Sequence, residues 1–175
     1  MSVKRELTLG YCPVGNGDSI EPFDSVFAKK KDISMGLDGV DAVIFWGGAD
    51  IHPSLYKQGR SYMSQAGVLP TRRDEFEWNV MKYCKINRIP MIGICRGAQL
   101  MCAFAGGTLI QHTTGHNSGP HAMTTKEGEV MTTSSCHHQM LYPWDIEHEM
   151  LAWSGLSLSK TYLDGKDNEI NMTGK

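Results

Sequence analysis

The 175-residue sequence lacks a strong excess of charge of either sign. Lys and Arg number 17 against 19 Asp and Glu, which gives a formal net charge of −2. This near-balance argues against a surface that coats nucleic acid, so no nucleic-acid partner is expected. The cationic run Lys29-Lys30-Lys31 is followed at once by Asp32, and we interpret it as the solvated end of a helix.

Long hydrophobic runs are missing as well. The apolar stretch within Met1 to Cys12 is too short for a secretory signal or a membrane span, so no membrane partner is expected. The five cysteines form no Cys-x-x-Cys pair and their number is odd, which disfavours a disulfide framework and a zinc ribbon. Reduced thiols in a cytoplasmic protein fit these observations best.

The sequence also has no internal repeat and no linker rich in Ser or Pro, so one domain over residues 1–175 is expected. Within it, buried strands alternate with helices. Nearly continuous apolar runs of strand length, typical of parallel strands buried on both faces, occur at 7–11, 41–46 and 90–95. Helices are expected over about 23–37, 73–87 and 96–105.

The helix expected over 73–87 has the clearest pattern. Apolar residues recur at three- and four-residue spacing, namely Phe76, Val80, Tyr83 and Cys84. Its amino-terminal part is rich in acidic residues, which the helix dipole stabilises there: Asp74, Glu75 and Glu77. Beyond residue 107 short β-like runs follow, at 108–112, 122–125, 129–133, 151–154 and 160–163. The sequence therefore predicts an α/β fold, a three-layer doubly wound, mainly parallel sheet with some antiparallel strands added.

The sharpest motif is Gly93-x-Cys95-x-Gly97-x-Gln99, at the end of a buried strand and the start of a helix. A strand that runs directly into a helix must turn sharply, and the two glycines let neighbouring backbone come close. A thiol at a helix amino terminus is favoured as the thiolate, the reactive form. Cys95 is therefore a candidate nucleophile, and the backbone N–H of Arg96 a candidate oxyanion donor.

A second loop is expected beside this turn. The strand over 41–46 ends in Gly47-Gly48, and loops at the carboxyl ends of parallel strands line the ligand crevice of doubly wound sheets. The bare backbone amides of this glycine pair can supply the second oxyanion donor.

These residues, with Arg73-Asp74 and the segment Ser134-Ser135-Cys136-His137-His138-Gln139, resemble class I glutamine amidotransferase-like domains. Within them they resemble the γ-glutamyl-γ-aminobutyrate hydrolase branch. The resemblance implies a flavodoxin-like domain with a nucleophile elbow. It also implies a Cys–His–Glu triad that hydrolyses a γ-glutamyl amide through a thioester, without a cofactor.

The same resemblance assigns roles to individual positions. Cys95 is implied as the nucleophile, and the amides of Gly48 and Arg96 as the oxyanion donors. The residues implied to bind the small-molecule γ-glutamyl substrate are Gly47, Gln99, His137 and His138.

The resemblance breaks down at the expected base. In the family a His-x-Glu pair lies near the carboxyl end, and none occurs in these 175 residues; Glu147-His148-Glu149 has the wrong spacing and is interpreted as an exposed turn. We therefore interpret the domain as incomplete in its carboxyl-terminal part. Three interpretations stay open: the segment belongs to the natural protein, the chemistry has been lost, or His137 or His138 is a substitute base.

Three functions remain in view: a free-standing γ-glutamyl hydrolase, a glutaminase subunit that delivers ammonia to a partner synthetase, and a catalytically dead binding protein. The oligomeric state, including a homo-oligomer, is left open. A zinc site is disfavoured, since the residues between His112 and His116 do not favour a helix and the adjacent His137 and His138 are poorly placed to chelate one ion.

Overall fold

The computed structural model describes residues 6–13, 21–117, 119–154 and 161–170. These residues fall into two compact units, which are described separately. The first unit comprises Met1–His52 and Ala66–Phe104, and the second Pro53–Gln65 and Ala105–Lys175. The expectation of one domain over residues 1–175 stays a prediction.

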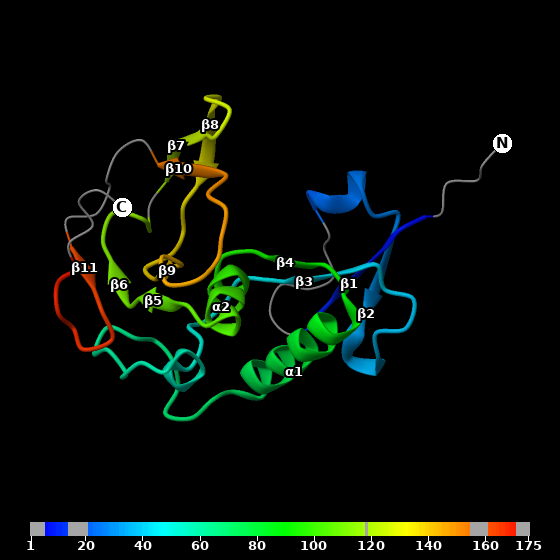
Figure 1. The fold of residues 1–175 in the computed structure, drawn as a ribbon, viewed down its shortest axis with the longest axis horizontal. Coiled ribbons are helices and arrows are strands. Elements are labelled where there is room, and N and C mark those ends of the chain that lie inside the picture. The colour runs from blue at the N-terminus through cyan, green and yellow to red at the C-terminus, as the bar shows by residue number, and fades with distance from the viewer. Residues whose placement is uncertain (1–5, 14–20, 118, 155–160, 171–175) are drawn as a thin grey trace. The chain divides into compact units, whose positions relative to one another are not determined.

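A four-stranded parallel sheet forms the centre of the first unit (Figure 1). Its strand order is β2-β1-β3-β4. The strands are β1 (Thr8–Tyr11), β2 (Lys29–Asp32), β3 (Ala42–Phe45) and β4 (Met91–Gly93). All four residues of β3 are buried, because this central strand is apolar throughout. The order 2-1-3-4 is that of flavodoxin-like sheets, which confirms the predicted doubly wound α/β fold.

The prediction of a helix over 23–37 is wrong. That segment contains strand β2 between two short 3-10 turns, Phe23–Ser25 and Ile33–Met35. The lysine run is thus an edge strand rather than a helix end, and its residues pair in parallel register with Thr8–Tyr11. Lysines are common on edge strands because their charge discourages pairing with a further strand.

The other two helices form as predicted: α1 spans Arg72–Asn87 and α2 spans Arg96–Ala105. Thr71 caps α1, since its hydroxyl accepts from the Asp74 N–H while the Asp74 carboxylate accepts from the Thr71 N–H. The apolar stripe of α1 buries Val80, Met81 and Cys84, whereas Tyr83, expected with them, is 45% exposed.

Antiparallel strands make up the second unit, which confirms the change of architecture expected after residue 107. Three small sheets have the orders β10-β7-β8, β11-β6 and β5-β9. The strands are β5 (Thr108–Ile110), β6 (His112–Thr113), β7 (Pro120–Thr125), β8 (Val130–Ser134), β9 (Met140–Tyr142), β10 (Ala152–Ser154) and β11 (Tyr162–Leu163). Residue 160, where the last strand was expected to begin, lies outside the described residues, as does 171–175.

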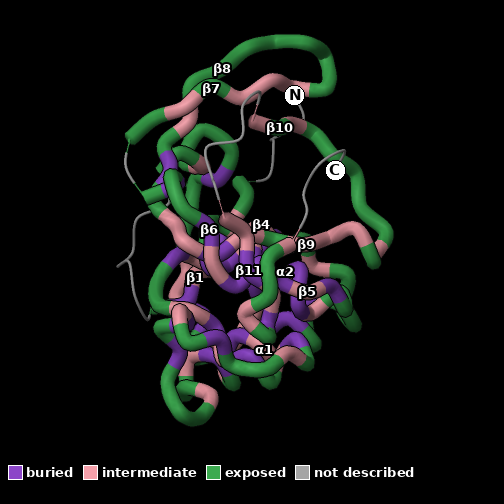
Figure 2. The backbone as a smooth tube through the Cα atoms, turned by 90° about the vertical axis from the view of Figure 1, so that its left-hand side faces the viewer, coloured by how far each residue is buried: buried purple, intermediate pink, exposed green. Residues whose placement is uncertain are grey.

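Burial is uneven within the second unit. Figure 2 shows the β7–β8 hairpin as partly or fully exposed along its length. The buried part includes Ile110 and Gln111, and Gln111 donates to the Tyr56 hydroxyl at 2.9 Å and to the Gln58 side chain at 2.8 Å. Tyr56 belongs to a 3-10 turn, Pro53–Tyr56, so these hydrogen bonds tie that turn to the strands.

Candidate active site

Cys95 lies at the turn between β4 and α2, in the left-handed backbone region with φ of 52°. A residue other than glycine rarely adopts this conformation, and such strain is concentrated at functional sites. The Gln99 N–H donates to the Cys95 carbonyl at 3.1 Å, which starts the hydrogen-bond ladder of α2. The side chain of Cys95 is exposed. Its expected place at a sharp strand–helix turn is confirmed, while its role as nucleophile stays a prediction.

The two glycines of the motif are required by close backbone approach. A Cβ on Gly93 would lie 2.6 Å from the Ala98 nitrogen, and one on Gly97 would overlap the Phe45 carbonyl oxygen. The Ile94 N–H also donates to that Phe45 oxygen at 2.9 Å. The turn that carries Cys95 is therefore fixed against the last residue of β3.

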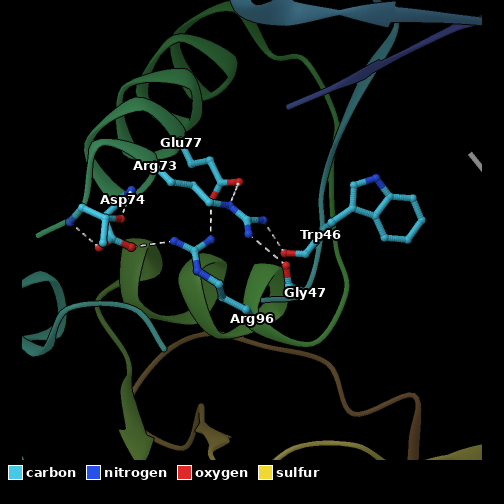
Figure 3. Close-up of polar contacts among 7 residues, drawn as sticks. Trp46, Gly47, Arg73, Asp74, Glu77 and Arg96 are labelled. Atoms are coloured by element: carbon cyan, nitrogen blue, oxygen red, sulfur yellow. Dashed lines mark hydrogen bonds and ion pairs between the residues drawn. The ribbon is translucent and has the colours of Figure 1, made fainter. Parts of the chain in front are cut away.

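The loop after β3 carries the other candidate oxyanion donor. Gly48 has φ of 144°, which favours glycine, and a Cβ there would lie 2.5 Å from Nη1 of Arg73. Arg73 donates through Nη1 to the Gly47 carbonyl at 3.0 Å and through Nη2 to the Trp46 carbonyl at 2.9 Å (Figure 3). One side chain from α1 thus holds two consecutive carbonyls of this loop.

Arg73, Asp74, Glu77 and Arg96 form a buried ion cluster, called the ion quartet below (Figure 3). Arg96 donates to Asp74 at 2.5 Å and pairs with Glu77, whose other oxygen accepts from Nε of Arg73 at 2.9 Å. Asp74 and Glu77 are at most 1% exposed, and Arg96 is 2% exposed. Two cations and two carboxylates balance, as buried charges require.

Sequence reasoning missed the ion quartet. It interpreted Asp74 and Glu77 only as acids favoured by the dipole in the first turn of α1. A signal was present, because positions 74, 77, 81 and 84 follow one another at helical spacing and so place both acids on the buried stripe. A buried acid needs a cationic partner, and Arg96 beside the candidate nucleophile provides it.

Gln99, implied by the resemblance as a substrate-binding residue, lies in the first turn of α2 and is 6% exposed. His137 and His138 belong to the second unit. His137 contacts the Gln139 carbonyl through Nδ1 at 3.0 Å, and its ring lies tilted beside that of His116, with ring centroids 4.9 Å apart. His138 lies beside His112, with 3.4 Å between their Nδ1 atoms. Substrate binding by Gly47, Gln99, His137 and His138 stays a prediction.

The positive charge is disfavoured on three of these rings, those of His112, His116 and His137. Burial lowers the pKa of His137, of His116 and of His112 from the usual 6.5, and neighbouring histidines lower each pKa further. For His137 the hydrogen bond with the Gln139 carbonyl opposes this in part. Folding therefore favours the neutral form of these three rings.

Two negative findings apply to the described residues. Within them, no group of three or more His, Cys, Asp or Glu is arranged to hold a metal ion. None of the described helices is long and apolar enough to span a membrane. Glu147, His148 and Glu149 are exposed, as expected, and Glu149 pairs with Lys126 at 2.5 Å.

Comparison with known proteins places this chain in a family. The family model described as Peptidase C26 matches residues 25–156. The chain belongs to the peptidase C26 family. Curated relatives of this chain carry the name glutamine amidotransferase-like protein.

Two curated relatives illustrate the family. A glutamine amidotransferase-like protein of Rickettsia prowazekii is 38% identical over 112 residues, covering 63% of this chain and 37% of the relative. The γ-glutamyl-CDP-amidate hydrolase of Campylobacter jejuni is 33% identical over 103 residues, covering 58% of this chain and 46% of the relative. The chain thus spans less than half the length of either relative.

Solved structures support the fold. A crystal structure of a glutamine amidotransferase from Thermotoga maritima superposes with a TM-score of 0.58 at 12% identity, covering 93% of this chain and 73% of that one. At this identity the likeness establishes the class I glutamine amidotransferase fold alone.

Limiting iodoacetamide at neutral pH should label Cys95 before the other cysteines. Cys12, Cys84 and Cys102 are buried, and burial raises the pKa of Cys84 to about 11. Cys136 is exposed like Cys95 but lies at no helix amino terminus, so it serves as the matched control. Peptide mapping by mass spectrometry gives the order, and equal labelling of Cys136 would count against an activated thiol.

The stability of the protein should fall as the pH drops from 7.5 to 5.5. Because the folded-state pKa values of His112, His116 and His137 lie below 6.5, the unfolded chain binds more protons, and stability is lost as pH falls through 6.5 and below. Thermal unfolding across this range measures the loss. His116→Gln, which removes one of these three rings, should reduce the pH dependence. An unchanged slope in His116→Gln would contradict this origin.

Proposed function

We propose that this chain provides the nucleophilic half of a cysteine-dependent hydrolase for γ-glutamyl amide bonds. The observation that carries the proposal is Cys95, exposed and strained at the amino terminus of α2, next to the glycine loop that ends β3. Its place within the peptidase C26 family, and the likeness to a relative named γ-glutamyl-CDP-amidate hydrolase, support this substrate class.

In the proposed reaction, the Cys95 thiolate attacks the γ-carbonyl carbon of the substrate. A carbon–sulfur bond forms while the carbonyl oxygen becomes an oxyanion, which accepts hydrogen bonds from the N–H groups of Gly48 and Arg96. The carbon–nitrogen bond then breaks, and the nitrogen leaves as an amine after taking up a proton. Water hydrolyses the resulting thioester to glutamate and restores the thiol.

A second candidate shares the first half of this reaction. A glutaminase subunit would form the same thioester from glutamine and pass the released ammonia to a partner synthetase. The likeness to a glutamine amidotransferase-like protein favours including it. Glutamate release from glutamine, compared with release from γ-glutamyl amines, separates the two candidates, and synthesis with an added partner supports the second.

We expect the 175-residue polypeptide by itself to turn over γ-glutamyl amides slowly or not at all. It contains no His-x-Glu pair, and a positioned acid–base residue typically contributes about 10²- to 10⁴-fold to the rate. A carboxyl-terminal extension that carries His-x-Glu should restore turnover, and a matched extension with Ala-x-Gln should not. The measurement is glutamate release at saturating substrate.

Two further variants test this expectation. Cys95→Ala should abolish the restored activity, while Cys136→Ala, at the other exposed thiol, should retain it. If the bare polypeptide turns over substrate at an ordinary enzyme rate, the expectation is wrong. His137→Ala and His138→Ala then become the variants that locate the base. If no thioester forms on Cys95 from any γ-glutamyl compound, a binding protein is the better explanation.

A further inference from the structure

The hydrogen bonds of Arg73 affect the direction in which the Gly48 N–H points. The Gly47 carbonyl, which accepts from Nη1 of Arg73, and the Gly48 N–H belong to the same peptide unit. Because that unit is planar and trans peptides place the carbonyl and N–H on opposite sides, fixing the Gly47 oxygen toward Arg73 fixes the Gly48 N–H away from it. The arginine thereby sets where this donor points.

This restraint matters because the loop has little conformational preference of its own. Gly47 and Gly48 lack side chains, so the peptide between them can rotate with little steric resistance. Rotation would break the bond from Arg73 to the Gly47 oxygen, while the bond to the Trp46 oxygen anchors the guanidinium on the residue before. A planar, two-pronged donor suits this task, and a lysine ammonium does not.

The arginine is itself held in place. Glu77 accepts from Nε of Arg73 and also pairs with Arg96, the residue after Cys95. The Arg73 side chain is only 12% exposed. The Glu77 carboxylate therefore orients two side chains. One is that of Arg73, which holds the Gly48 peptide, and the other is that of Arg96, whose backbone N–H is the other candidate oxyanion donor.

We infer that Arg73 is a positioning residue that aims the Gly48 N–H at the oxyanion of the acyl-transfer step, through its bonds to the Trp46 and Gly47 carbonyls. The inference rests on the proposed function, since it presumes that Cys95 attacks a carbonyl. Arg73 does not itself contact the reacting atoms in this assignment.

The test compares two reactions of Cys95 in the same variants. Acylation by the γ-(4-nitrophenyl) ester of N-acetylglutamate creates an oxyanion, and its leaving group needs no proton, so it is measurable without a general acid. Alkylation by iodoacetamide displaces iodide from a saturated carbon and creates no oxyanion. A merely structural role for Arg73 would slow both reactions or neither, whereas a positioning role slows only acylation.

The variants are Arg73→Lys, which keeps the charge of the ion quartet, and Arg73→Met, which removes it. Their matched controls are Arg72→Lys and Arg72→Met, at the exposed neighbouring position on α1. Removing an oxyanion donor typically costs about 10²- to 10³-fold, so misdirecting one should slow acylation by about 10- to 10²-fold in both Arg73 variants. The alkylation rate should stay within about twofold of the unaltered protein, and both Arg72 variants should behave like that protein.

Each outcome decides a separate claim. Unchanged acylation in Arg73→Lys, or an equal loss in both reactions, would overturn the positioning role and leave the proposed function standing. Should Arg73→Met fail to fold, the charge-conserving Arg73→Lys decides alone. If the unaltered protein is not acylated faster than Cys95→Ala, while iodoacetamide still labels Cys95, the proposed function itself fails.

Discussion

The ion quartet of Arg73, Asp74, Glu77 and Arg96 is the constraint on which the candidate site depends. It joins α1 to the loop after β3 and to the turn that carries Cys95, two backbone segments rich in glycine and therefore poorly restrained by their own side chains. The capping box at Thr71 fixes the start of α1, so Asp74 serves both the helix cap and the quartet. The rigid helix α1 thereby holds in place the backbone around Gly48 and Arg96, whose N–H groups are proposed to stabilise an oxyanion.

Such a cluster is better suited to positioning than to stabilising the fold. Taking charges out of water offsets most of their mutual attraction, and apolar replacements of whole buried ion pairs are often neutral or stabilising. Removing a single partner is different, since it leaves an uncompensated buried charge and costs about 3–5 kcal/mol. The desolvation cost of such a cluster is justified where the position of nearby groups matters. In this unit the cluster adjoins Cys95, the strained residue of the elbow.

The sequence predicted those features that are set by neighbouring residues. The elbow could be predicted because Gly93, Cys95 and Gly97 are close in sequence and their spacing indicates one sharp turn. Helix α1 was predicted from its helical periodicity, and strand β3 from its continuous apolar run. Strand β2 was missed because Lys29 to Asp32 has no strand-like pattern, and only its pairing with Thr8–Tyr11 makes it a strand. The ion quartet was missed because it joins residues about 20 positions apart, and an acid near a helix start already has a local explanation. The roles of His137 and His138 rest on resemblance and stay predictions.

The most direct test of the account is a crystal structure of the polypeptide acylated on Cys95 by the γ-(4-nitrophenyl) ester of N-acetylglutamate. Without a His-x-Glu pair, hydrolysis of the thioester should be slow enough for the adduct to be trapped. We expect its carbonyl oxygen to accept hydrogen bonds from the N–H groups of Gly48 and Arg96, with Arg73 still bound to the Trp46 and Gly47 carbonyls. A thioester oxygen turned away from both amides, with the ion quartet intact, would contradict the central claim.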